Sequence, residues 1–120
     1  MPTLYGIRNC DTVRKARRWL NAHGVDHAWR DFRDDGLDAA DLDRWLAAVG
    51  DAVLVNRRGR TWRQLPEATR DGLDATALRA LLLEEPTLIK RPVLVDGDDV
   101  VVGFDAEAYA ERFSGRGHTT

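Results

Sequence analysis

Residues 3–16 read TLYGIRNCDTVRKA and join a short β-prone run to the start of a helix. The run ends at Gly6-Ile7 and a helical pattern begins just after Asp11, so Cys10 falls on a strand-to-helix loop. The first N–H groups of a helix have no partner inside it, and together with the helix dipole they stabilise an anion. A thiol placed there has a lowered pKa and is a usable nucleophile. We therefore predict that Cys10 is reactive, although a lone cysteine can also be an inert buried side chain.

The composition predicts one soluble globular domain. The 120 residues are 43% hydrophobic and 32% charged, with a net charge of −2, so no excess of positive charge indicates nucleic-acid binding. The cationic side chains are all arginines except Lys15 and Lys90, and arginine suits the recognition of oxyanions. A single cysteine excludes an intramolecular disulfide and a cysteine-rich metal site. No stretch has the length of a membrane span, and no apolar leader precedes the first strand. We expect a cytoplasmic monomer that contacts no membrane.

The order of elements predicts an α/β fold. The β-prone runs are residues 3–7, 25–32, 93–95 and 100–102, and helical patterns follow Asp11, Asp38, Asp74 and Asp105. The first two strands and the helix between them form a βαβ unit, which requires parallel strands. The turn Asp96-Gly97-Asp98 favours a hairpin of the last two strands. Together these give a four-stranded mixed sheet (βαβ…ββα) with helices on both faces, interrupted by a helical insertion.

A second candidate for chemistry is Lys90-Arg91-Pro92, directly before the third strand. A proline that enters a sheet strand cannot donate to the ladder, which indicates a bend or a cis peptide bond. If the hairpin packs beside the first strand, this turn faces the Cys10 loop. Arg91 would then offer a planar, bidentate fork to an anion near the sulfur. A surface arginine beside a structural turn is the alternative.

Further candidates lie beside the cysteine and in the helical block. The segment Asn56-Arg57-Arg58-Gly59-Arg60 could add cationic groups to the same pocket, or it could be a solvated basic loop. Asn9 and Thr12 flank Cys10, and the Thr12 hydroxyl could either bond to the thiolate or cap the helix.

The sequence gives no sign of a metal site. Residues 31–36 faintly resemble a calcium loop, but Arg33 and Leu42 occupy the third and twelfth positions, where carboxylates are needed. The histidines, His23, His27 and His118, lack the spacing of metal ligands and a catalytic partner motif. We expect no metal and no Cys-His hydrolase.

Several short segments form a distinctive combination. They are Tyr5 to Thr12, Arg17-Arg18-Trp19-Leu20, Asp35-Gly36-Leu37, Thr61-Trp62-Arg63, Ile89-Lys90-Arg91-Pro92 and Gly103-Phe104. Together they closely resemble the YffB-type proteins of the ArsC/Spx family, which are arsenate-reductase-like, and the resemblance covers about residues 2–113.

The resemblance implies a thioredoxin-like fold. Residues 1–114 would form a single ArsC-like domain with a helical insertion at about residues 37–86, followed by a flexible C-terminal tail at residues 115–120. It also implies that Cys10 is the redox cysteine, that Arg91 binds the oxyanion and that Pro92 faces the cysteine.

Two departures from the family pattern restrict the expected activity. Spx-type regulators commonly carry C-x-x-C, whereas this chain has Val13 at the later position. Glutaredoxin-linked arsenate reductases use three arginines around the cysteine; the first aligns with Asn56 and the third near Gly103, so only Arg91 carries over cleanly. We therefore expect thiol chemistry rather than efficient arsenate reduction.

The sequence thus predicts a glutathione-dependent thiol reductase, or an arsenate-reductase-like oxidoreductase, that acts on a small oxyanion or a disulfide. With one cysteine, the oxidised species must be resolved by an external thiol, for which glutathione is the obvious co-substrate. No tightly bound cofactor is expected. The predicted catalytic residues are Cys10 and Arg91, and the predicted glutathione-binding residues are Asn9, Asp11, Thr12, Arg57, Arg58 and Pro92.

Two alternatives remain. One is a non-catalytic, Spx-like regulatory protein that binds RNA polymerase or another partner, against which the missing second cysteine weighs because it removes a disulfide switch. The other is a true arsenate reductase.

Overall fold

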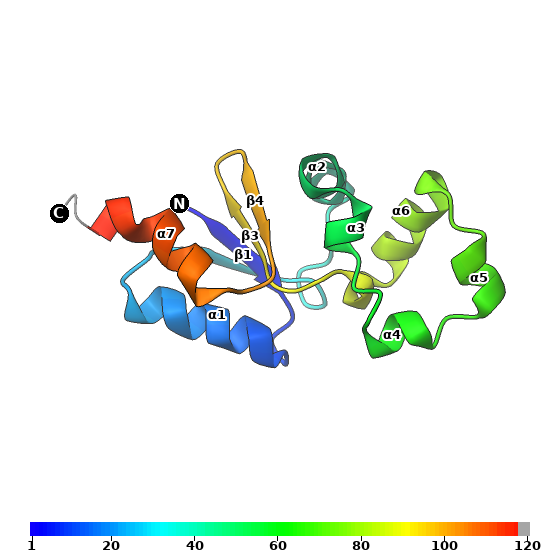
Figure 1. Ribbon diagram of the computed structural model, residues 1–120, viewed down its shortest axis with the longest axis horizontal. Coiled ribbons are helices and arrows are strands. Elements are labelled where there is room, and N and C mark those ends of the chain that lie inside the picture. The colour runs from blue at the N-terminus through cyan, green and yellow to red at the C-terminus, as the bar shows by residue number, and fades with distance from the viewer. Residues whose placement is uncertain (118–120) are drawn as a thin grey trace. The chain divides into compact units, whose positions relative to one another are not determined.

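A computed structural model describes residues 1–117 of the protein, and the chain divides into two compact units. Unit 1 joins residues 1–31 to the segment that begins at Arg91, and unit 2 consists of Phe32–Lys90. The elements of unit 1 are β1 (Thr3–Gly6), α1 (Asp11–Ala22), β2 (Ala28–Asp31), β3 (Val93–Asp96), β4 (Asp99–Val102) and α7 (Ala106–Gly117). Those of unit 2 are α2 (Ala39–Val49), α3 (Asp51–Leu54), α4 (Arg60–Arg63), α5 (Glu67–Asp71), α6 (Ala75–Glu84) and the 3-10 helix η1 (Pro86–Leu88) (Figure 1).

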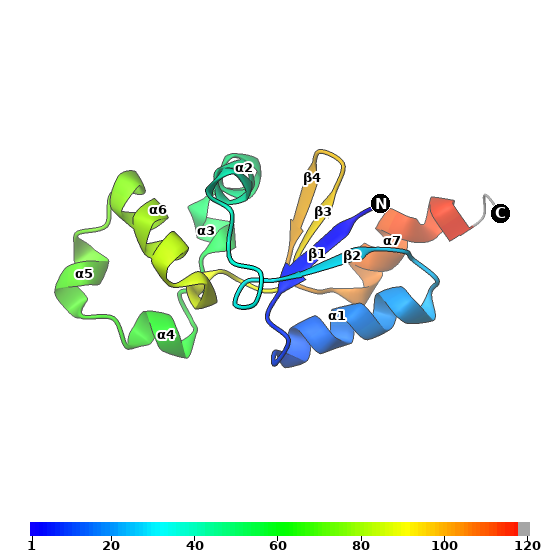
Figure 2. The same ribbon diagram turned by 180° about the vertical axis from the view of Figure 1, so that it is seen from behind.

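Unit 1 contains a four-stranded mixed sheet in the order β2-β1-β3-β4. β1 pairs in parallel with β2 and antiparallel with β3, while β3 and β4 form an antiparallel hairpin (Figure 2). The hairpin closes through Gly97-Asp98, where Gly97 has φ 63°, a conformation that glycine adopts without a steric cost. The predicted mixed sheet with a helical insertion is therefore confirmed.

The core of unit 1 lies between one face of the sheet and two helices. Leu4 and Leu94 are cross-strand partners, and both are fully buried. They cluster with Leu20 of α1 and with Tyr109 and Phe113 of α7, and both views show these helices alongside the sheet. Because α1 and α7 share this core, they cover the same face of the sheet. The expectation of helices on both faces is wrong for unit 1.

Unit 2 is a set of short helices around an apolar centre. Leu42, Trp45, Leu54 and Leu82 are fully buried there. Helix α2 begins at the predicted cap, since the Asp38 carboxylate accepts a hydrogen bond of 2.8 Å from the Ala40 amide. The Asp74 carboxylate caps α6 in the same way.

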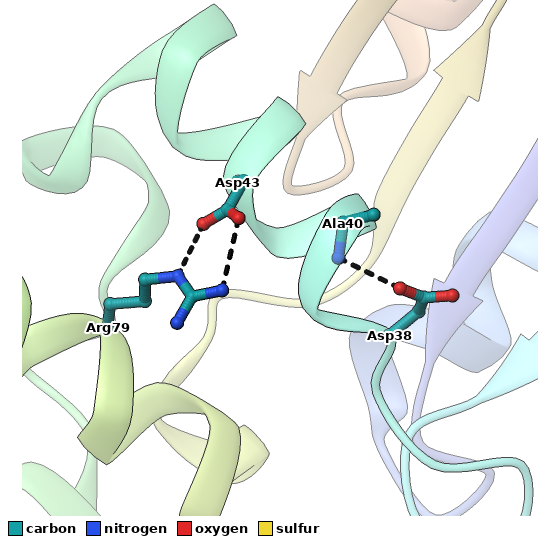
Figure 3. Close-up of polar contacts among 4 residues, drawn as sticks. All are labelled: Asp38, Ala40, Asp43 and Arg79. Carbon is teal, nitrogen blue, oxygen red and sulfur yellow. Dashed lines mark hydrogen bonds and ion pairs between the residues drawn. The ribbon is translucent and has the colours of Figure 1, made fainter.

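An ion pair joins α2 to α6. Arg79 donates to the two carboxylate oxygens of Asp43 over 2.6 and 3.1 Å (Figure 3). The neighbouring charge lowers the pKa of Asp43, mainly through these hydrogen bonds. The contact links two helices that are far apart in the sequence.

The predicted C-terminal tail at residues 115–120 is wrong in part, because α7 extends to Gly117. Residues 118–120, which include His118, lie outside the described residues. Within residues 1–117, none of the helices combines the length and the apolar character needed to span a bilayer.

Candidate active site

Cys10 lies at the N-terminus of α1, as predicted. It is the residue before the first turn, with extended backbone angles (φ −119°, ψ 124°), and its carbonyl accepts the 2.9 Å hydrogen bond from the Arg14 amide. The side chain makes no capping hydrogen bond and is only partly buried. The sulfur is therefore both near the free amides of the first turn and open to a reactant.

The environment of Cys10 favours the thiolate. Partial burial raises the pKa of the thiol, but the Val13 amide, the Arg91 side chain and the Thr12 amide each lower it. The balance leaves the pKa of Cys10 below its ordinary value. This is the direction that the sequence predicts, and the cause includes a cation besides the helix N-terminus.

The sheet topology brings Arg91 to the cysteine. β3 runs antiparallel to β1, with Val93 opposite Tyr5, so the residues that precede β3 lie at the end of β1 where the Cys10 loop begins. Pro92 is buried and the Arg91–Pro92 peptide bond is cis, as expected. Arg91 is partly buried and interacts with the sulfur through its side chain.

Asp31 is a further residue of this site that the sequence reasoning missed. It ends β2 opposite Gly6, is only 3% exposed, and accepts a 2.9 Å hydrogen bond from the Arg8 amide. The carboxylate therefore anchors the loop between β1 and Cys10. The sequence offered one sign of this role: Asp31 is an acidic residue at the end of the second predicted strand. Because parallel neighbouring strands end at the same edge of a sheet, it could be expected near the end of β1.

A close approach of backbone and side chain sets the position of α1. A Cβ atom on Gly6 would lie only 2.7 Å from Cγ2 of Val13, which is buried in the first turn of the helix. Only glycine leaves room for this packing. Val13, at the position of a second cysteine in C-x-x-C, thus holds the first turn against the end of β1.

Gly103 lies beside the proline turn, where its amide donates a 2.8 Å hydrogen bond to the Pro92 carbonyl. Its φ of 84° is a conformation that side chains other than glycine rarely adopt. A residue with a side chain would be strained in this backbone conformation.

The other predicted ligands fall into two groups. Asn9, Asp11 and Thr12 are exposed around Cys10, and Thr12 contributes its amide within α1 rather than acting as the cap. Arg57 and Arg58 belong to unit 2, and their role in glutathione binding stays a prediction.

A partly exposed thiolate beside an arginine can attack an electrophilic sulfur or an oxyanion centre while the cation neutralises the charge of the reactant. The model of the ArsC family matches residues 5–112. The chain belongs to the ArsC family. This match covers nearly all of both units.

Similar proteins support the same assignment. The solved structure of the YFFB (PA3664) protein has 43% sequence identity and a TM-score of 0.88, and the match covers 92% of this chain and 97% of that one. An uncharacterized protein of Haemophilus influenzae is 44% identical over 114 residues, which are 95% of this chain and 100% of the relative. The global transcriptional regulator Spx of Listeria innocua is 28% identical over 109 residues, covering 89% of this chain and 82% of the regulator. The thioredoxin-like fold and the ArsC/Spx, YffB-type resemblance are thereby confirmed.

Proposed function

We propose that this member of the ArsC family is a glutathione-dependent thiol oxidoreductase with Cys10 as its single nucleophile. The observation that carries the proposal is the lowered pKa of the partly exposed Cys10 thiol beside Arg91. A thiolate, rather than a thiol, is the attacking species in disulfide exchange. The family supports an oxidoreductase, and the glutathione dependence is our own addition.

The proposed reaction uses two exchanges. The Cys10 thiolate attacks the glutathione sulfur of a mixed disulfide, so that a Cys10–glutathione disulfide forms and the substrate thiolate leaves and takes up a proton. The thiolate of a second glutathione then attacks this disulfide, which releases oxidised glutathione and restores the Cys10 thiolate. Overall, one mixed disulfide is reduced and one glutathione is oxidised.

The chain's own residues explain why an external thiol is needed. Cys10 is the only cysteine in the sequence, and Val13 takes the place of a second one in the first turn. No intramolecular disulfide can therefore resolve the intermediate. In this proposal Arg91, whose side chain interacts with the Cys10 sulfur, binds a carboxylate of glutathione or an oxyanion, since a guanidinium forms paired hydrogen bonds with both.

A coupled assay tests the proposal. Formation of oxidised glutathione is followed with glutathione reductase and NADPH over three substrates: the mixed disulfide of glutathione and 2-mercaptoethanol, a glutathionylated protein, and arsenate. We expect turnover of one of the disulfides that is lost in Cys10→Ser and retained in Arg18→Ala, which removes an exposed arginine of α1. Equal rates for wild type and Cys10→Ser on all three substrates would refute the proposal.

The second candidate is a non-catalytic regulator, and the similarity to Spx favours it. In that case Cys10 would sense oxidants or be vestigial, and the chain would bind RNA polymerase stoichiometrically. A pull-down with purified polymerase separates the two functions: binding of equimolar polymerase together with no turnover in the coupled assay would select the regulator.

A further inference from the structure

A cavity of about 390 Å³ lies wholly within unit 2, and its lining includes neither Cys10 nor Arg91. Its volume is within the usual range for small-molecule sites. The walls include Leu46 of α2, Trp62 of α4, Arg70 of α5 and Leu78 of α6. The Asp43–Arg79 ion pair joins α2 to α6, which supply two of the walls (Figure 3).

Most of the charged groups around the cavity already have partners. Arg57 donates a 2.9 Å hydrogen bond to Asp51, and its guanidinium lies 5.3 Å from the centre of the Trp62 ring. Asp74 caps α6 by accepting a 2.8 Å hydrogen bond from the Ala77 amide. Arg57, Asp51 and Asp74 thus each have a hydrogen-bond partner within unit 2.

Arg70 differs from these groups. It is partly buried and lines the cavity, and its Nε atom is buried without a hydrogen-bond partner among residues 1–117. An arginine whose Nε–H has no partner retains a donor for an anion, and a carboxylate can accept from two guanidinium N–H groups side by side.

The remaining walls select the kind of anion. Leu46, Leu73 and Leu78 give the cavity an apolar side, which favours a ligand with a hydrophobic body. Asp51 and Asp74 also line the cavity. Arg57 offsets the charge of Asp51, and the carboxylate of Asp74 opposes a doubly charged group such as a phosphate monoester. One uncommitted cation, two carboxylates and an apolar wall together fit a singly charged, amphiphilic anion.

We propose that this cavity binds a small organic monocarboxylate, whose carboxylate pairs with Arg70 and whose apolar body packs against Leu46, Leu73 and Leu78. The residues that line this site belong to unit 2 and include neither Cys10 nor Arg91. Unit 2 would then bind a small molecule in addition to any substrate of Cys10.

Titration with benzoate, followed by the amide resonances of isotope-labelled full-length protein, tests this site. We expect saturable shifts for the Trp62 indole and for the Ala75 and Leu78 amides. Benzamide, which has the same shape but no charge, should bind at least about tenfold more weakly, because a charge-assisted hydrogen bond gives about that factor. Equal binding of benzoate and benzamide, or no saturable shifts, would overturn the proposal without any variant being made.

Variants locate the carboxylate. Arg70→Ala should weaken benzoate binding at least about tenfold, whereas Arg63→Ala, which removes an exposed arginine of α4, should not. If Arg70→Ala loses the dispersed spectrum of a folded protein, Arg70→Gln, which keeps most of the stem, takes its place. Cys10→Ser should bind benzoate as wild type does, so failure of the thiol chemistry leaves this result intact. Wild-type affinity in the folded Arg70 variant would place the anion elsewhere and refute the assignment.

Discussion

The Arg91 side chain contacts the sulfur of Cys10, although the whole of unit 2 lies between these two residues in the sequence. The pairing of β3 with β1 produces this contact, because it places the start of one strand at the end of the other. A cation delivered by the sheet thus adds to the effect of the helix N-terminus on the thiol.

The first prediction concerns the acidity of Cys10. The rate of alkylation by iodoacetamide as a function of pH should give an apparent pKa below the free value of about 8.5. Arg91→Ala should raise this pKa, since it removes both a hydrogen bond and a positive charge from the thiolate. Arg18→Ala serves as the matched control and should leave the profile unchanged. An unshifted profile in Arg91→Ala would show that the helix alone activates the thiol.

The second prediction concerns anion binding by Arg91. A charge-assisted hydrogen bond contributes about 1.5–3 kcal/mol, so Arg91→Ala should weaken the binding of S-methylglutathione at least about tenfold. Arg91→Lys should recover only part of the affinity, because an ammonium group cannot reproduce the planar fork. Calorimetric titration at fixed ionic strength measures both. Smaller losses are expected for Arg57→Ala and Arg58→Ala, and wild-type binding by Arg91→Ala would mean that the anion site lies elsewhere.

The third prediction concerns Asp31 as a positioning residue. Asp31→Ala leaves the Arg8 amide without its acceptor, which should cost about 1–3 kcal/mol of unfolding free energy. Loosening of the loop should also slow the alkylation of Cys10 at a pH where the thiolate predominates. Asp31→Asn retains an acceptor and should restore much of the alkylation rate, whereas Asp26→Ala, at an exposed site, should change neither quantity. If Asp31→Ala lost stability but alkylated at the wild-type rate, the role of Asp31 would be structural only.

The parts of the fold that local chemistry determines were predictable. Aspartates before apolar periodic segments marked the starts of α2 and α6, and the glycine turn marked the hairpin. The reactive position of Cys10 followed from the strand-to-helix boundary alone.

Features that depend on tertiary pairing were not predictable in this way. The role of Asp31 requires β2 to lie next to β1 in one particular register, and the sequence alternation in that strand was too weak to set it. The shared face of α1 and α7 likewise depends on aromatic contacts such as Trp19 with Tyr109, whose ring centroids lie 5.6 Å apart. Such contacts between distant segments leave no local pattern.

The fourth prediction concerns Tyr109, whose hydroxyl is buried and makes no hydrogen bond among residues 1–117. Tyr109→Phe removes the unsatisfied group and should raise the free energy of unfolding by about 1 kcal/mol. Tyr109→Ala should lower it by about 3–5 kcal/mol, because it also empties part of the core. Urea denaturation of the three proteins measures both changes, and a clear loss of stability in Tyr109→Phe would reveal a partner for the hydroxyl.

The same tyrosine gives a pH dependence. Burial raises the pKa of Tyr109 above its ordinary value of 10.0, so above that pH the unfolded chain ionises while the folded chain stays neutral. This contribution to stability is complete below pH 10 and is lost as the pH rises further. Urea midpoints should therefore fall more steeply above pH 10 for wild type than for Tyr109→Phe.

The division of unit 1 between the two sides of the helical insertion bears on the order in which the protein matures during synthesis. β1 emerges from the ribosome early, but its antiparallel neighbour β3 follows only after the whole of unit 2 has been made. Until then the central strand lacks one partner, and the Cys10 thiol lacks Arg91. A nascent or prematurely terminated chain would lack the contribution of Arg91 to the lowered pKa of Cys10, so full activation of the nucleophile would coincide with completion of the sheet.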